Sequence, residues 1–193
     1  MALTTSTMQL SLGVEAPDFA LPDPIGKIHS LGDFAGRPAL LIAFICNHCP
    51  YVKHIAPAFA QLAEESQKQG VGVVAINSND FEHYQDDSPA KMKEEIALRG
   101  YTFPYLVDQS QQIAKAYRAA CTPDFYLFDA DRKLVYRGQM DASRPGNGLP
   151  ITGKDLRDAI EAVLAGQPVS KDPRPSIGCN IKWRPGNEPQ YSR

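Results

Sequence analysis

The chain has 193 residues, of which 43% are hydrophobic, and a formal net charge of −2. That length and composition fit one domain with a proper core. Acidic and basic residues are interleaved without a long block of like charge, so no electrostatic case exists for a nucleic-acid or membrane partner. The longest apolar run, Ala39 to Cys46, is too short to span a bilayer. The first residues do not resemble a secretory signal, and we expect a cytoplasmic protein.

The N-terminal third predicts an arm, a hairpin and a strand. Residues 1–12 carry no periodicity and are predicted to form a flexible arm before a domain over residues 13–165. Prolines around Gly26 favour turns that frame short extended pieces, in the manner of an edge hairpin. The uncharged run from Ala39 to Ile45 predicts a buried strand.

A helix is predicted directly after Cys49 and ends near Gly70. Pro50 suits its first turn, where the missing N–H costs nothing, whereas Pro57 should kink it. The remaining predicted elements are strands at 71–76, 103–107, 125–128 and 134–136, and helices after Ser88, after Asp108 and from Thr152 to Leu164. This alternation predicts an α/β fold with a mixed central β-sheet flanked by helices on both faces.

Residues 166–193 form a proline-rich C-terminal arm. Such a segment is ordered only if it docks. It holds an apolar patch with Cys179, Ile181 and the single tryptophan, Trp183, which argues for docking onto the domain or onto a partner.

Two cysteines, Cys46 and Cys49, lie between the first buried strand and the long helix. Two thiols at this spacing can close and reopen a disulfide, and unpaired N–H groups at a helix N-terminus stabilise a thiolate. Two other interpretations stay open. The thiols could be buried residues without function, or they could bind a metal together with His48 or His54. We expect redox chemistry and no metal.

Several features together resemble a known superfamily. The order of strand, C-x-x-C, long helix and later Thr122-Pro123 before a strand hairpin resembles the thioredoxin fold. The segment Ala16-Pro17-Asp18-Phe19 resembles the opening of the redoxin superfamily of alkyl hydroperoxide reductase and thiol-specific antioxidant (AhpC/TSA) proteins. The segment from Cys46 to His54 is similar to its peroxiredoxin-like branch, with a CNHC motif. The resemblance covers about residues 13–165.

The resemblance implies roles for individual residues. Cys46 would be the more exposed, attacking thiol and Cys49 the buried resolving thiol of a thiol–disulfide oxidoreductase. Pro123 would be a cis-proline facing the pair, and Thr122 would offer backbone hydrogen bonds to a bound chain. The implied partners are a protein or low-molecular-weight thiol or disulfide and an external reductant, with no bound cofactor and with a role in antioxidant defence. The oligomeric state is not implied.

His48 adds a prediction about redox potential. An imidazole between the cysteines stabilises the Cys46 thiolate and thereby makes the disulfide a stronger oxidant. The C-x-H-C pattern resembles protein disulfide isomerase and the periplasmic disulfide oxidase, with couples near roughly −180 and −120 mV, against roughly −270 mV for thioredoxin. We therefore predict a couple more oxidising than thioredoxin.

Peroxidase activity is the alternative within the family. The peroxiredoxin motif places a proline seven residues and a threonine or serine three residues before the reacting cysteine. If Cys49 were the reacting cysteine, these positions would hold Ile42 and Cys46; if Cys46 were, they would hold Ala39 and Ala43. Neither cysteine therefore has the proline and the hydroxyl residue of the motif. Alternatives from other classes are a non-enzymatic binding module that docks a partner through the tail, and a metal chaperone.

Other reactive side chains receive less specific predictions. Cys121 is either an additional resolving thiol or a small packed residue, and Cys179 is either redox-active, if the arm folds back to Cys46, or an apolar anchor. Arg118 and Arg137 could place a cation near a thiolate, but surface salt bridges are favoured. The acidic residues Asp80, Asp86 and Asp87 predict a solvated loop without a metal site.

Overall fold

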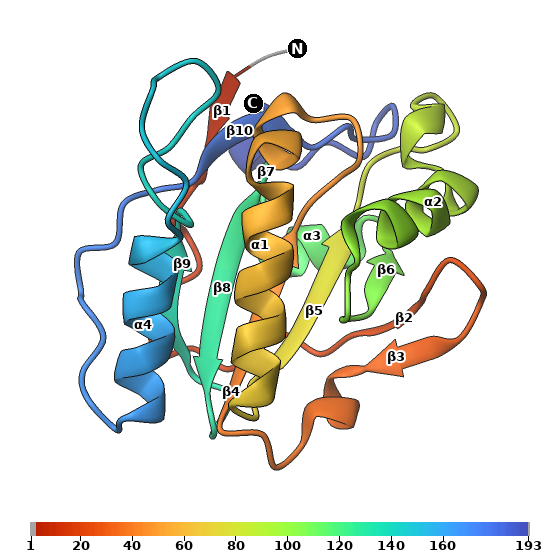
Figure 1. Cartoon of the computed structure of the whole chain (residues 1–193). Helices are drawn as coiled ribbons and strands as arrows, with labels where there is room; N and C mark the ends of the chain where they lie inside the picture. Colours follow the sequence, from red (N-terminus) through yellow and green to blue (C-terminus); the bar gives the residue numbers. More distant parts are fainter. Residues whose placement is uncertain (1–2, 193) are drawn as a thin grey trace.

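A computed structural model describes residues 3–192, and its core is a five-stranded sheet (Figure 1). Its strand order is β6-β5-β4-β8-β9; β4, β5 and β6 run parallel, whereas β8 pairs antiparallel with both β4 and β9. The strands are β4 (Ala39–Phe44), β5 (Gly72–Asn77), β6 (Tyr105–Val107), β8 (Asp124–Asp129) and β9 (Leu134–Gly138). Every residue of β4 and β5 is buried, as expected for strands covered on both faces.

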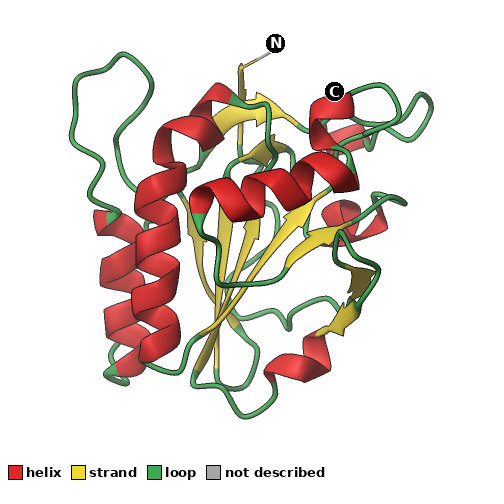
Figure 2. Cartoon of the chain, turned by 45° about the vertical axis from the view of Figure 1, so that its right-hand side comes forward, coloured by secondary structure: helices red, strands yellow, loops and turns green. Residues whose placement is uncertain are grey.

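Alternate residues of β4 enter two separate cores. Leu41 and Ala43 belong to the core that also contains side chains of α1 (Pro50–Lys68), α2 (Pro89–Arg99) and α4 (Lys154–Leu164). Leu40, Ile42 and Phe44 face the core beneath α3 (Gln112–Ala116) and the N-terminal hairpin. Figures 1 and 2 show α1 and α4 side by side over one face of the sheet.

Local sequence signals place most helix ends. Pro50 opens α1 as predicted, the helix continues through Pro57, and Gly100 ends α2 in the left-handed conformation. The predicted hairpin forms from β2 (Ala20–Pro22) and β3 (Ile28–Ser30). Short 3₁₀ helices cover Leu31–Phe34, Gln85–Asp87 and Gln190–Ser192.

Two helices begin later in the chain than the sequence predicts, α3 at Gln112 rather than directly after Asp108 and α4 at Lys154 rather than at Thr152. Gln111, not Asp108, is the N-cap of α3, although a carboxylate oxygen of Asp108 accepts the Ala114 N–H. Gly153 is the N-cap of α4, and the hydroxyl of Thr152 accepts the Lys154 N–H.

The two ends of the chain form a second sheet with the middle of the chain. Its order is β1 (Leu3–Thr5), β10 (Ile177–Asn180) and β7 (Cys121–Thr122), all antiparallel. The prediction of a flexible arm over residues 1–12 is therefore wrong for residues 3–5, because backbone pairing with β10 orders them; residues 1–2 lie outside the described residues. The predicted docking of the C-terminal arm is confirmed, and it takes place through β10.

The sequence predicted Arg137 to form a surface salt bridge, but this residue of β9 is a fully buried cation. Its guanidinium lies 3.3 Å from a carboxylate oxygen of Asp124 and donates to the Arg118 carbonyl and the Thr7 hydroxyl. Burial raises the pKa of Asp124, and the charge of Arg137 opposes that rise. This buried pair ties the N-terminal segment to the sheet.

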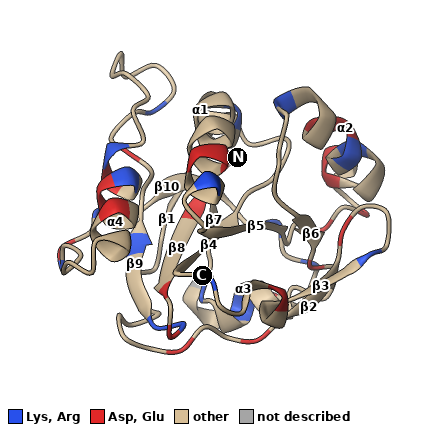
Figure 3. Ribbon diagram, turned by 60° about the horizontal axis from the view of Figure 1, so that its bottom comes forward, with Lys and Arg blue, Asp and Glu red and all other residues tan. Residues whose placement is uncertain are grey.

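Charged side chains of both signs are interspersed along α2 and α4 (Figure 3). No helix within residues 3–192 combines the length and the apolar composition that crossing a bilayer requires.

Candidate active site

The two cysteines lie where the central strand β4 gives way to α1. Cys49 is the N-cap residue of α1, and Cys46 precedes it in the connecting turn. The exposed fractions are 1% for Cys46 and 0% for Cys49. The expectation that Cys46 is the more exposed thiol is therefore wrong for this conformation, because Thr122 and the tail strand pack over the pair.

Thr122 and Pro123 face the cysteines across the site. The Thr122–Pro123 peptide bond is cis, as expected. The Thr122 hydroxyl lies 3.2 Å from Cys46 Sγ, and its carbonyl accepts a hydrogen bond from the Cys49 thiol at 3.2 Å. The Thr122 backbone, which was expected to bind another chain, is occupied in this structure by β10 of the same chain, where Thr122 pairs with Cys179.

The two thiols share a hydrogen bond and ionise as a pair. The hydrogen bond from Cys46 lowers the pKa of Cys49 to about 5 against the opposing effect of burial, helped by Cys179 and by the backbone N–H of Val52. Burial raises the pKa of Cys46, and its bond to Cys49 and the negative charge of Asp87 raise it further. Once the pair has lost one proton, the two sulfurs share the other, and Cys46 is a thiolate when that proton is on Cys49.

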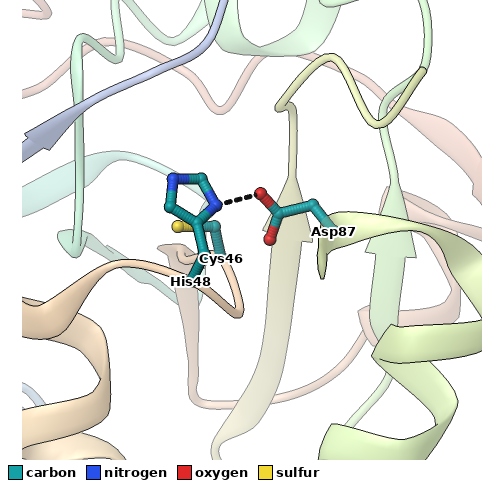
Figure 4. A group of neighbouring side chains, drawn as sticks. All are labelled: Cys46, His48 and Asp87. Carbon is teal, nitrogen blue, oxygen red and sulfur yellow. Dashed lines mark hydrogen bonds and ion pairs between the residues drawn. The ribbon is translucent and has the colours of Figure 1, made fainter. Parts of the chain in front are cut away.

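Asp87 belongs to the site, although the sequence had predicted a solvated acidic loop. This residue ends the 3₁₀ helix Gln85–Asp87 and is 1% exposed. Its carboxylate lies 2.5 Å from His48 Nδ1 (Figure 4). It also accepts the Asn47 N–H at 2.7 Å. The side-chain amides of Asn79 and Asn77 donate to it at 2.8 and 3.3 Å.

These bonds keep a buried carboxylate ionised. Burial acts to raise the pKa of Asp87, but the bonds from His48, Asn79 and Asn47 hold it below its ordinary value. A negative charge next to Cys46 opposes the thiolate stabilisation expected from His48. The imidazole also stacks on Tyr84, with ring centroids 5.8 Å apart, so its orientation is fixed from two sides.

Cys46, His48 and Asp87 also form a potential set of metal ligands. One donor atom from each lies within 4.8 Å of the others, and thiolate, imidazole and carboxylate are all ligands that zinc accepts. Asp87 thus takes the place of Cys49 in the metal-ligand set that the sequence suggests, in which His48 or His54 accompanies the two cysteines. A metal ion would have to replace the hydrogen bond between His48 and Asp87 and would need Cys46 as a thiolate.

The other two cysteines have different environments. Cys121 is fully buried, and its sulfur lies 3.8 Å from the Pro123 carbonyl and 4.0 Å from the Ser176 carbonyl. Burial raises its pKa well above the ordinary value, so its surroundings favour a packed, inert thiol. The sulfur of Cys179 lies 2.8 Å from the sulfur of Cys49. The arm therefore folds back as the redox interpretation required, but it reaches Cys49 and not Cys46.

One sequence signal pointed toward Asp87 without identifying it. Carboxyl ends of parallel neighbouring strands meet at one edge of a sheet, and β4 and β5 are such neighbours. The residues after β5 must therefore lie near Cys46. Three aspartates follow that strand before α2, and the sequence pattern does not indicate which of them enters the site.

Comparison with known proteins gives concordant findings. The model of the AhpC/TSA family matches residues 12–137. The thiol-disulfide oxidoreductase ResA of Geobacillus thermodenitrificans is 31% identical over 168 residues, 82% of each chain.

Two solved structures extend the comparison. A conserved protein from Geobacillus kaustophilus is 52% identical, with a TM-score of 0.93 over 96% of this chain and 98% of that one. A thiol:disulfide interchange protein of the thioredoxin family from Chlorobium tepidum has a TM-score of 0.61 at 17% identity, over 80% of this chain and 98% of that one. At that identity the likeness concerns the fold alone, which is thioredoxin-like.

Proposed function

We propose that Cys46 and Cys49 are the redox pair of this chain, which belongs to the AhpC/TSA family and is a thiol–disulfide oxidoreductase. The observation that supports this assignment is the pairing of the two thiols at the N-terminus of α1, opposite the cis Thr122–Pro123 bond. A buried pair that shares one proton holds a reactive thiolate near neutral pH.

The proposed reaction begins with Cys46. Its sulfur attacks one sulfur of a substrate disulfide while its proton passes to the Cys49 thiolate, and the leaving substrate thiolate then takes that proton from Cys49. The Cys49 thiolate next attacks the Cys46 sulfur of the mixed disulfide, which forms the Cys46–Cys49 bond and releases the second substrate sulfur as a thiolate that takes a proton from water. The substrate has gained two electrons and the protein has lost them.

We propose a cytoplasmic location, where an external thiol reductant can return the oxidised pair to the dithiol. The proposed substrates are protein or low-molecular-weight disulfides, with a role in antioxidant defence. The peroxidase alternative has less support: Ala39 and Ala43 occupy the positions of the peroxide-binding proline and hydroxyl residue and are buried apolar residues of β4.

The test is catalysed reduction of insulin by dithiothreitol, with Cys46→Ser and Cys49→Ser variants. We expect Cys46→Ser to fall to the uncatalysed rate, whereas Cys121→Ser, a matched change at another buried thiol, retains activity. Wild-type activity at the background rate would contradict the assignment. Oxidation of Cys46 by hydrogen peroxide far faster than that of a free thiol would favour the peroxidase, and stoichiometric zinc lost in Cys46→Ser would favour a metal protein.

A further inference from the structure

The C-terminal strand β10 brings a third thiol into the site. It pairs with β7 in a register that places Cys179 opposite Thr122, and it also packs against α1. The Cys179 sulfur is 2.8 Å from Cys49 Sγ, and Cys49 also interacts with Cys46. Cys49 thus interacts with two thiols, that of Cys46 in the same turn and that of Cys179 from the C-terminal segment.

The close approach of β10 to β7 depends on Gly178. A Cβ atom at this position would lie 2.0 Å from the Thr122 carbonyl oxygen and 3.1 Å from Pro123 Cδ. No side chain fits there without displacing the strand. The strand is fixed further along the chain, where the Ile181 N–H donates to the Ala120 carbonyl and the Lys182 N–H to the Asn79 side chain. The position of Cys179 is therefore built into the fold.

We propose that Cys179 is a third redox residue, which accepts the disulfide from the Cys46–Cys49 pair and leaves Cys46 as a thiol again. The Cys179 sulfur attacks Cys49 Sγ of the Cys46–Cys49 disulfide. The Cys49–Cys179 bond forms, the Cys46–Cys49 bond breaks, and the proton of Cys179 goes to the departing Cys46 sulfur. No electrons leave the protein in this exchange. The inference rests on the proposed function, because it starts from the disulfide formed there.

The electrostatics of the site favour exchange after oxidation rather than before. In the reduced protein, burial, followed by the hydrogen bond to Cys49 and its negative charge, raises the pKa of Cys179 to about 12. A disulfide-bonded Cys49 carries no charge, so two of these three causes disappear. The nearby Lys182 ammonium then lowers the pKa of Cys179. Formation of the first disulfide thus activates the thiol that attacks it.

The experiment maps the disulfide of the oxidised protein. The full chain is oxidised with one equivalent of diamide, alkylated with N-ethylmaleimide, digested without reduction and analysed by mass spectrometry. We expect a Cys49–Cys179 peptide and alkylated Cys46. A Cys46–Cys49 bond with alkylated Cys179 would overturn the inference while leaving the proposed function intact. Absence of any bond that includes Cys46 or Cys49 would overturn both.

Two variants separate chemistry from folding. In Cys179→Ser, the oxidised protein should hold the Cys46–Cys49 bond, with alkylation of Cys46 reduced by about tenfold or more, the ratio that a difference of about 30 mV between the two disulfides produces. Gly178→Ala keeps all four thiols and displaces the strand, so it should shift the bond in the same direction. The matched variant Cys121→Ser should give the wild-type map. An unchanged map in Cys179→Ser would contradict the proposal.

Discussion

Replacement of Asp87 by asparagine tests how the carboxylate acts on Cys46. The substitution keeps the shape and one oxygen acceptor but removes a buried negative charge that lies within 4.8 Å of the Cys46 sulfur. Two unit charges at that distance interact by about 3.5 kcal/mol at an effective dielectric constant of about 20. That energy corresponds to a factor of about 300 in the population of the Cys46 thiolate.

The expected change in rate is smaller than the change in population. A thiolate of lower pKa is a weaker nucleophile, with a Brønsted coefficient of about 0.4–0.5, which removes nearly half of the gain on a logarithmic scale. His48, which lies 2.5 Å from the carboxylate, already offsets part of the effect of the Asp87 charge on Cys46, and this reduces the expected gain in rate further. We therefore expect alkylation of Cys46 by iodoacetamide at pH 7 to become roughly tenfold faster in Asp87→Asn.

The assay is the rate of Cys46 alkylation followed by mass spectrometry. Asp86→Asn is the matched control, because it removes the same charge from an exposed neighbour and should leave the rate unchanged. A slower reaction in Asp87→Asn would refute the reasoning, since it would mean that Asp87 activates Cys46 through His48 rather than opposing its ionisation.

Three further predictions follow from the buried charges and the thiol pair. Thiolate absorbance at 240 nm should rise with a midpoint near pH 5 and disappear in Cys49→Ser, and a midpoint near the ordinary pKa of a thiol would contradict the assignment. Because the pKa of Cys49 is lowered in the folded protein, its contribution to stability is complete above the ordinary pKa and is lost as the pH falls through about 5. The Cys46–Cys49 couple, titrated against glutathione in the Cys179→Ser variant, should lie above roughly −270 mV; a potential at or below that value would contradict the role predicted for His48. Arg137→Met should lower the free energy of unfolding in urea by about 3–5 kcal/mol because it leaves Asp124 unpaired in the interior, whereas Lys133→Met, at an exposed pair, should cost at most about 1 kcal/mol.

Local patterns in the sequence were sufficient to predict the central fold and the position of the two-cysteine turn. The uncharged run from Ala39 predicted β4, because a strand buried on both faces is apolar at every position. The C-x-x-C turn followed by Pro50 predicted the start of α1, because proline is favoured in the first turn of a helix. The cis Thr122–Pro123 bond followed from the resemblance rather than from composition. The thioredoxin-like arrangement of strands and helices was therefore within reach of the sequence.

The surroundings of the pair were decided by tertiary structure. Asp87 and Cys179 lie 38 and 130 residues from Cys49 along the chain, and no periodicity links such positions. Asp87 turns inward because Asn77, Asn79 and His48 supply donors that compensate for its burial. Cys179 reaches Cys49 because β10 pairs with β7 at a glycine. Backbone pairing and charge compensation depend on which segments meet in space, and only the folded chain determines that.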